Sequence, residues 1–246
     1  MSPNPLAGRV ALVTGAGVRV GRAIALALGR AGADVAVHYR ESAGPAEEVA
    51  DALRRTGRRA AALAADLSRP DACRELVRAV AAALGGLDVL VHSAANFHRA
   101  TLAETDAALW DDAMNLNARA AFLLAREAAP LLRARRGRVV LVSDLLATLP
   151  VRHYAAHSVS KAAAEGVVRA LAVELAPEVA VNGVAPGTVL VPDGTSPETA
   201  ARWAAEAPLA RNGSAEDVAE TVLFLCAGPS FITGQIVRVD GGKSLR

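Results

Sequence analysis

Short runs of apolar, largely β-branched residues alternate with longer Ala-rich segments along the whole chain. Seven runs have the length and composition of buried strands: Val10 to Thr14, Asp34 to His38, Ala60 to Ala64, Asp88 to His92, Arg138 to Ser143, Val179 to Val184 and Gln235 to Val239. Helical periodicity marks Val20 to Gly29, Pro45 to Arg55, Pro70 to Leu84, Thr105 to Arg135 with a break, His153 to Leu175 and Ala215 to Ala227. This alternation predicts a Rossmann-type, doubly wound α/β fold, in which a seven-stranded parallel sheet carries helices on both faces.

The chain has 246 residues and contains no internal repeat, low-complexity tract or linker, so we expect a single domain over residues 1–246. One irregular stretch begins at Gly187 and is rich in Gly and Pro as far as Pro197. Its turn content predicts a substrate loop at about residues 187–213, beside the cofactor. A solvent loop without a role is the alternative interpretation.

Composition narrows the function classes. Aromatic residues make up 3% of a chain that is 52% apolar, so Ala, Val and Leu must build the core. The 27 basic and 25 acidic residues are spread without a basic stripe, which argues against a nucleic-acid partner. No apolar run reaches the roughly 18 residues of a membrane span, and no His or Cys pair has metal-ligand spacing with a third partner. Cys73 and Cys226 fall in apolar helical patterns, as expected for buried thiols of a cytoplasmic protein.

A glycine-rich turn follows the first strand, in the order Thr14-Gly15-Ala16-Gly17-Val18-Arg19-Val20-Gly21. Glycines let a diphosphate approach the backbone, and the free N–H groups and dipole of the following helix attract its charge. Three glycines alone are a weak signal, but a strand before them and a helix after them favour a dinucleotide site.

The residues at the end of the second strand indicate whether the cofactor is NAD or NADP. An acidic residue there would bind the ribose hydroxyls of NAD, whereas this chain has Tyr39-Arg40-Glu41-Ser42. Arg40 can pair with a 2′-phosphate and Ser42 can donate a hydrogen bond to it, so the sequence favours NADPH. A surface arginine is the competing interpretation of Arg40. Asp66 is placed either to accept from the adenine amino group or to cap a helix.

Seven short motifs occur in the order seen in the short-chain dehydrogenase/reductase family, which the chain resembles over essentially its whole length. They are residues 14–21, 66–67, 115–116, 143–144, 161, 182–187 and 239–242. The resemblance implies an NADPH-dependent oxidoreductase acting on a small-molecule substrate. It places the cofactor against Thr14, Gly15, Gly17, Arg19, Val20, Gly21, His38, Tyr39, Arg40, Ser42, Asp66, Leu67, Ser93, Ala94, Ala95, Lys161, Pro186, Gly187 and Thr188.

Within that family the chain is most similar to the pteridine reductase branch, because of Arg19 in the glycine-rich turn, His38-Tyr39 before Arg40, and Asp144 where most relatives have serine. The branch stacks a pterin on a phenylalanine that matches Phe97. By resemblance, Asn115 holds a proton-relay water and Lys161 binds the nicotinamide ribose. Tyr154 and Val189 complete the expected substrate wall with Phe97.

The chain departs from the family pattern at two places. His92-Ser93-Ala94-Ala95 replaces the usual Asn-Asn-Ala-Gly, with His92 expected to pack at the strand end. His157 stands four residues before Lys161, where the family has its catalytic tyrosine, and Tyr154 lies one helical turn earlier. His98 and His153 either line the substrate mouth or face solvent.

Histidine changes the chemistry that is expected of this position. Neutral imidazole is a feeble acid, so His157 can donate usefully only as imidazolium, whose ordinary pKa is about 6.5. Lys161 would lower that pKa and Asp144 would raise it, and the sequence leaves the sign open. A C=N substrate requires a weaker acid than a C=O substrate does, because its nitrogen is more basic than a carbonyl oxygen.

We therefore expect hydride transfer to a C=N bond of a pterin or cyclic imine, or to a C=O bond. Asp144 and His157 would manage the proton, with Asn115 and Lys161 completing the relay. The alternative is a catalytically impaired NADP(H)-binding sensor or scaffold protein. The two Ala-rich helices that start near Thr105 and His153 predict a homotetramer or homodimer, although core burial explains part of their apolar character.

Overall fold

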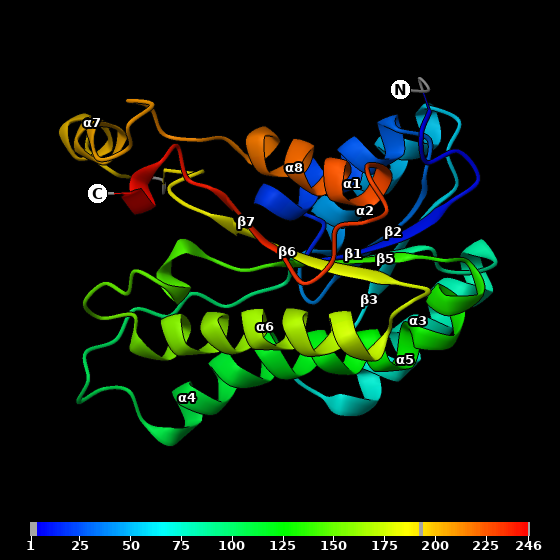
Figure 1. Ribbon diagram of the computed structural model, residues 1–246, viewed down its shortest axis with the longest axis horizontal. Helices are drawn as coiled ribbons and strands as arrows, with labels where there is room; N and C mark the ends of the chain where they lie inside the picture. The colour runs from blue at the N-terminus through cyan, green and yellow to red at the C-terminus, as the bar shows by residue number, and fades with distance from the viewer. Residues whose placement is uncertain (1–3, 192–193, 246) are drawn as a thin grey trace.

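The computed structural model describes residues 4–191 and 194–245. All seven strands form one parallel sheet in the order β3-β2-β1-β4-β5-β6-β7, which confirms the predicted fold class (Figure 1). The strands are β1 (Val10–Thr14), β2 (Asp34–Tyr39), β3 (Ala60–Ala64), β4 (Val89–His92), β5 (Arg138–Val142), β6 (Ala180–Pro186) and β7 (Ile236–Val239).

Helices cover both faces of the sheet. One core cluster packs α1 (Arg19–Arg30), α2 (Ala43–Arg55) and α8 (Ala215–Ala227) on one face. A second packs α3 (Pro70–Leu84), α5 (Ala120–Ala134) and α6 (Ala155–Glu174) on the other, with α4 (Ala107–Met114) beside α6 (Figure 1). Both clusters are dominated by Ala, Val and Leu, as the composition requires. None of the described helices combines the length and apolarity needed to cross a bilayer.

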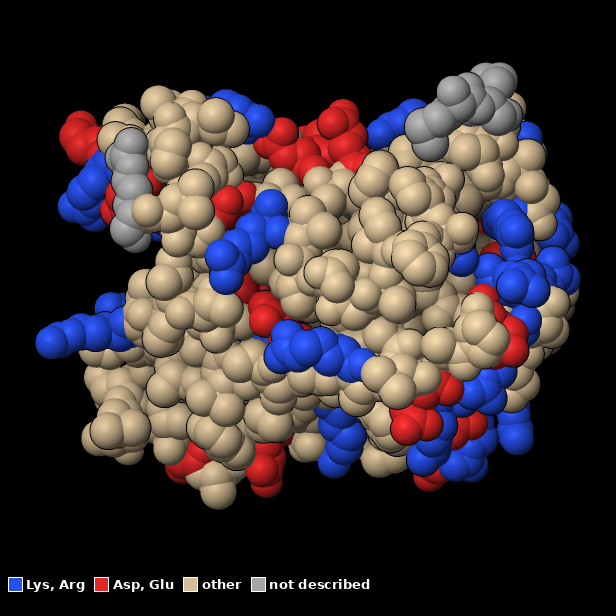
Figure 2. Space-filling model, viewed as in Figure 1, with Lys and Arg blue, Asp and Glu red and all other residues tan. Residues whose placement is uncertain are grey.

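The strand order reverses at β1, which pairs with β2 on one side and with β4 on the other. In open parallel sheets such a reversal leaves a crevice beyond the carboxyl ends of the strands, and ligands bind there. At the same edge of the molecule, Figure 2 shows the surface hollowed between the lobe that carries α7 and the part below it. The fold therefore places the ends of β1, β4 and β5 around one crevice.

The helical segment expected from Thr105 to Arg135 runs without interruption from Ala107 to Ala134. Between α4 and α5 lies a π-helical turn, η1 (Asn115–Arg119), in place of the expected break. Such a turn inserts an extra residue into the helix and changes the direction of the side chains that follow. This local geometry decides which asparagine reaches the site.

The expected substrate loop at residues 187–213 contains a helix, α7 (Pro197–Ala205), which begins where the Gly- and Pro-rich stretch ends. The Ser196 hydroxyl caps this helix by accepting from the Thr199 N–H, and Pro197 occupies the first helical turn. The adjoining Pro192 lies outside the described residues. Two short 3₁₀ helices, η2 (Leu145–Ala147) and η3 (Lys243–Leu245), complete the fold.

Candidate active site

The glycine-rich turn between β1 and α1 has almost no room for side chains. Gly15 has φ +64°, and a Cβ on it would lie 2.9 Å from the Ala94 Cα. A Cβ on Gly17 would lie 3.1 Å from the Ser42 hydroxyl oxygen, and one on Gly21 would collide with the Gly15 carbonyl. The α1 N-cap, Val18, makes no side-chain capping bond, so the first N–H groups of the helix remain available to a ligand. This cradle fits the diphosphate of a dinucleotide.

His38 supports the glycine-rich turn from behind. Its Nδ1 accepts a hydrogen bond from the Gly15 N–H at 3.1 Å, so the hydrogen on the ring is at Nε2, which donates to the Ala65 carbonyl at 3.0 Å. Burial lowers the pKa of His38 to about 4. Both ring nitrogens are used by the backbone, which gives His38 a supporting position where a cofactor contact was expected.

Thr14 and His92 form a second support. The Thr14 hydroxyl oxygen accepts from the N–H groups of Ser93 and Ala94, both at 3.0 Å, so its own hydrogen is directed to His92 Nδ1, also at 3.0 Å. His92 Nε2 then donates to the Leu116 carbonyl at 3.1 Å. Burial lowers the pKa of His92 to about 3, and the ring packs at the strand end as expected. His92 thus ties β1 and β4 to the π-helical turn.

At the adenosine end, Arg40 and Ser42 lie on either side of Glu41, next to the N-terminus of α2. Arg40 pairs with Glu41 at 2.9 Å, and both side chains are largely exposed. An exposed pair of this kind stabilises little, so a phosphate can replace the Glu41 carboxylate. Hydrogen bonds from Ser68 hold the pKa of Asp66 below its usual value, and Arg69, not Asp66, stands at the N-cap of α3.

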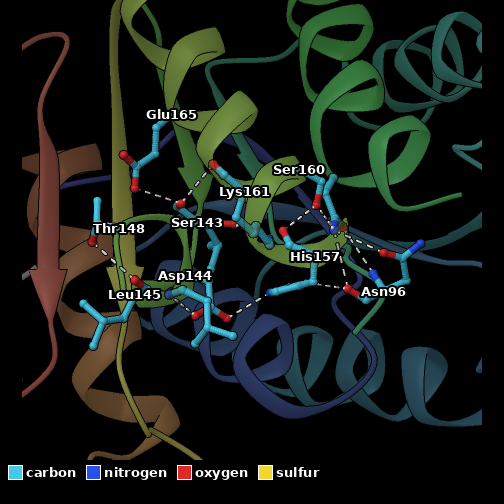
Figure 3. A network of polar contacts seen from close by, with 12 residues as sticks. Asn96, Ser143, Asp144, Leu145, Thr148, His157, Ser160, Lys161 and Glu165 are labelled. Carbon is cyan, nitrogen blue, oxygen red and sulfur yellow. Dashed lines mark hydrogen bonds and ion pairs between the residues drawn. The ribbon is translucent and has the colours of Figure 1, made fainter. Parts of the chain in front are cut away.

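His157 and Asp144 meet at the carboxyl end of β5 (Figure 3). Asp144 caps η2 through Oδ1, which accepts from the Leu146 N–H at 2.8 Å. Its Oδ2 lies 3.2 Å from Nε2 of His157, in the first turn of α6. The other ring nitrogen, Nδ1, lies 3.0 Å from the carbonyl oxygen of Asn96. The His157 side chain is 3% exposed and that of Asp144 is 25% exposed, so the carboxylate is the open end of the pair.

These contacts define how many protons the pair holds. A carbonyl oxygen can only accept, so His157 Nδ1 must carry a hydrogen. A neutral ring would then present a lone pair at Nε2 to an ionised carboxylate, which is repulsive. At 3.2 Å the two groups form a hydrogen bond when one additional proton lies on Nε2 or on Oδ2. In that form Asp144 and His157 can act together as an acid.

Lys161 lies one helical turn beyond His157 and is buried. Its Nζ donates to the Val142 carbonyl at 2.8 Å. Burial lowers the pKa of Lys161 to about 8, and the negative charge of Asp144 opposes that shift. Beneath it, the Ser143 hydroxyl faces Glu165 Oε1 at 3.2 Å, which satisfies a largely buried carboxylate (Figure 3).

Asn117, and not Asn115, joins the network around His157. Its side-chain nitrogen donates to Asn96 Oδ1 at 3.1 Å and to the Ser160 hydroxyl at 2.9 Å, and its side chain is almost fully buried. The assignment of the relay asparagine to Asn115 is therefore corrected, because η1 directs Asn117 inward. A signal existed in the sequence: Asn117 lies four residues after buried Ala113 and four before buried Ala121, on the apolar face.

Two aromatic rings stand beside the acid pair. Phe97 stacks on Tyr154 with 4.6 Å between ring centroids, and meets the edge of His157 at the same distance. Phe97 is 56% exposed, so it offers a ring face to a ligand. Val189, the third expected wall residue, is instead buried in the core cluster with α1 and α8.

Three further residues of the expected cofactor set have contacts within the protein. Gly187 follows β6 and donates to the Val239 carbonyl, Thr188 accepts from Gly213, and Leu67 is buried in the core. His98 is exposed and lies 2.8 Å from Asp112. Among the described residues, no group of His, Cys, Asp and Glu has a metal-binding arrangement. Cys73 and Cys226 are both buried thiols, whose pKa burial raises to about 11 and about 12.

Comparisons with known proteins identify the family of this chain. The sequence model of a family described as enoyl-(acyl carrier protein) reductase matches residues 15–244. A short-chain type dehydrogenase/reductase from Picea abies is 37% identical over 252 residues, which cover 97% of this chain and 93% of that protein. A hydroxynaphthalene reductase-like protein from Metarhizium anisopliae is 34% identical over 260 residues, covering 98% of this chain and 97% of that one.

Solved structures show the same relationship. A crystal structure of a short chain dehydrogenase from Burkholderia cenocepacia in complex with NADP superposes with a TM-score of 0.92 and is 36% identical. The match covers 98% of this chain and 100% of that one. With a parallel seven-stranded sheet, a glycine cradle at the strand-order reversal and relatives matched over nearly their full length, this chain belongs to the short-chain dehydrogenase/reductase family of oxidoreductases.

Proposed function

We propose that this protein is an NADPH-dependent reductase that acts on a C=N bond of a pterin or cyclic imine, or on a C=O bond of another small molecule. The bound cofactor would supply the hydride. The observation that carries the proposal is the contact between His157 Nε2 and Asp144 Oδ2 at 3.2 Å, since two groups so placed can hold a transferable proton at the crevice. A reduction of either bond consumes one proton in addition to the hydride.

NADPH is the cofactor that the chain's own residues support. The α1 N-terminus and the glycine turn would hold the diphosphate, and Lys161 would hold the nicotinamide ribose. Arg40 and Ser42 would bind a 2′-phosphate, because β2 ends without a carboxylate at that point. The related Burkholderia cenocepacia structure holds NADP.

Asp144 is the group that would pass the proton to the substrate. Its carboxyl is partly open, whereas the His157 ring behind it is almost completely enclosed. This arrangement makes the shorter reach of imidazole unimportant, because His157 restores the proton on Asp144 instead of touching the substrate. A positioned acid of this kind contributes about 10²–10⁴ in rate.

A C=N substrate suits this acid better than a ketone. Its nitrogen accepts a proton more readily than a carbonyl oxygen does, so a carboxyl or imidazolium donor is strong enough. The exposed Phe97 face, backed by Tyr154, would support a flat heterocycle by stacking. These features, with Arg19 in the turn, support the proposal that the chain is similar to the pteridine reductase branch.

The test compares His157→Ala with Ser158→Ala, a change at the next residue of α6, whose buried hydroxyl has no hydrogen-bond partner. NADPH oxidation is followed with dihydropterin, cyclic-imine and ketone substrates, and NADPH affinity by calorimetry. We expect His157→Ala to lose about a hundredfold in kcat with NADPH affinity retained, and Ser158→Ala to behave as the natural protein. Unchanged turnover in His157→Ala removes the proton pair from the mechanism. Tight NADPH binding without turnover of any substrate establishes the alternative, a sensor or scaffold.

We also propose a homotetramer or homodimer. Trp110 on α4, Phe122 on α5 and Val159 on α6 are all at least 40% exposed, although these helices pack on one face of the sheet. Exposed apolar side chains of this size favour burial between subunits. Molar mass by light scattering tests this, with Phe122→Glu expected to lower the mass.

A further inference from the structure

The carbonyl of Asn96 decides where His157 carries its ring hydrogen. It lies 3.0 Å from Nδ1 and can only accept, so the hydrogen sits on Nδ1 and Nε2 faces Asp144. If the carbonyl moved away, the ring could carry its hydrogen at Nε2 alone. A neutral ring of that form would donate to the Asp144 carboxylate and leave the pair without its additional proton. The placement of one backbone carbonyl is therefore linked to the acid.

That carbonyl belongs to a loop that contains no helix or strand. The loop spans residues 93–100 after β4, and the residues on both sides of Asn96, which are Ala95 and Phe97, are exposed. Asn96 itself is half-buried. The Thr14 hydroxyl fixes the start of the loop through Ser93 and Ala94, and the Ala100 N–H donates to the His153 carbonyl at its end, so the contacts of Asn96 set the position of its middle.

The Asn96 side chain is clamped from two sides. Its Nδ2 donates to Asp112 Oδ2 at 2.6 Å, and its Oδ1 accepts from Asn117 at 3.1 Å. The backbone N–H of Asn96 in turn donates to Asn117 Oδ1 at 3.2 Å. Reversing the Asn117 amide would place two donors against each other, so this orientation is the one that the contacts allow.

The clamp also returns to His157 along α6. Asn117 donates to the Ser160 hydroxyl at 2.9 Å, and that hydroxyl donates to the His157 carbonyl at 2.7 Å. The same buried amide, that of Asn117, therefore helps to fix the positions of both the Asn96 loop and His157. His98 Nε2 also contacts this group of residues, since it lies 2.8 Å from Asp112 Oδ2, the oxygen that accepts from Asn96 Nδ2.

We propose that Asn96, held by Asp112 and Asn117, is a positioning residue that fixes His157 with its hydrogen on Nδ1, so that Nε2 and Asp144 share the transferable proton. This inference rests on the proposed reductase function for its catalytic consequence, but the state of the ring is a property of the protein alone. It assigns a role to the hydrogen bonds that join Asn96 to Asp112 and Asn117.

The test is a charge exchange across the clamp. Asn96→Asp faces the Asp112 carboxylate with a second carboxylate and displaces the loop. Asn96→Asp combined with Asp112→Asn restores a donor and acceptor in the reverse order. Asp111→Asn, at an exposed neighbour on the same helix, is the matched control for the change of charge.

We expect Asn96→Asp to lower kcat by about tenfold or more, since misplacement by about 1 Å can cost a hundredfold, while NADPH affinity is kept. The double variant should recover most of that loss, and the control should lose nothing. In ¹⁵N-labelled protein without substrate, the His157 ring signals, assigned by their absence in His157→Ala, should show a hydrogen on Nδ1 in the natural protein and a mixture in Asn96→Asp.

Unchanged ring signals in a folded Asn96→Asp variant overturn the inference, whether or not the protein is active. If the ring signals respond as expected but the natural protein reduces no substrate, the reductase proposal fails and the positioning role stands. Failure of the double variant to recover both the ring signals and kcat also overturns the inference, because the clamp would then not act through the pairing of Asn96 with Asp112.

Discussion

The backbone N–H of Gly15 points at His38 Nδ1 from 3.1 Å, so the atom that holds the cofactor turn is also the atom that must gain a proton when this imidazole becomes charged. Protonation of His38 therefore breaks the support of the turn. Burial lowers the pKa of His38 from 6.5 to about 4, which means that the folded state resists this protonation.

The first prediction is a loss of stability in acid. Because the unfolded chain binds the proton at higher pH, stability from His38 is fully present above pH 6.5 and is lost as pH falls from 6.5 to about 4. The gap between the two pKa values corresponds to about 3 kcal/mol. Urea unfolding across this range should show a shallower acid dependence in His38→Asn than in the natural protein. Equal slopes of the unfolding free energy against pH in the two proteins would show that protonation of His38 does not cause the loss of stability.

The second prediction concerns the choice of cofactor. Arg40→Ala should weaken NADPH binding by about 10- to 100-fold and leave NADH binding unchanged, because only the 2′-phosphate gives the guanidinium a charged partner. Glu41→Gln should tighten NADPH binding, since it removes the carboxylate that lies 2.9 Å from Arg40. Calorimetric titration measures both. Arg22→Ala, an exposed arginine of α1, is the control, and an equal effect there would make Arg40 an ordinary surface charge.

The third prediction separates stability from activity at Lys161. Burial lowers its pKa from 10.5 to about 8, so below pH 8 the folded protein carries a constant cost for enclosing the ammonium. Stability should rise as pH increases from about 8 to 10.5. Lys161→Met should stabilise the cofactor-free protein at neutral pH by about 1–2 kcal/mol, because the lost bond to Val142 offsets part of the gain.

The same Lys161→Met variant should lose most of its turnover, since the charge proposed to hold the nicotinamide ribose is gone. Chemical unfolding and NADPH oxidation check the two halves on one preparation. Lys243→Met, at the partly exposed lysine that pairs with Glu206, should gain no stability. A Lys161→Met variant that is both less stable and active would contradict the account.

The fourth prediction is a stabilising change at the end of α5. Arg136 follows the C-cap residue Arg135 and has φ 49°, a left-handed conformation that favours glycine. Arg136→Gly should raise the free energy of unfolding by up to about 1 kcal/mol, because the strain of the side chain is removed. Arg136→Ala keeps the Cβ and should give no gain. Equal stabilities of the two variants in urea unfolding would show that backbone strain does not act here.

Much of the fold follows from local sequence. Strands β1 and β3 match the expected runs, and β1 does so because a fully buried strand needs a continuous apolar stretch between turn residues. The glycine turn is equally local, since Gly15 and Gly21 act within a few residues of each other. The short helix α7 has no strong local signal, because its start depends on a single Ser196 cap at the end of a Gly- and Pro-rich segment.

The sequence by itself determined the sheet, the glycine-rich turn and the spacing of His157 four residues before Lys161, because each of these depends on residue type and short spacing. The tertiary structure decided which groups the site residues bind. His157 meets a carbonyl 61 residues away, and Asn117 replaces Asn115 because a π-helical turn redirects the side chains. A hydrogen bond requires a donor–acceptor distance correct to within tenths of an ångström and a suitable angle, and only the packed chain sets both.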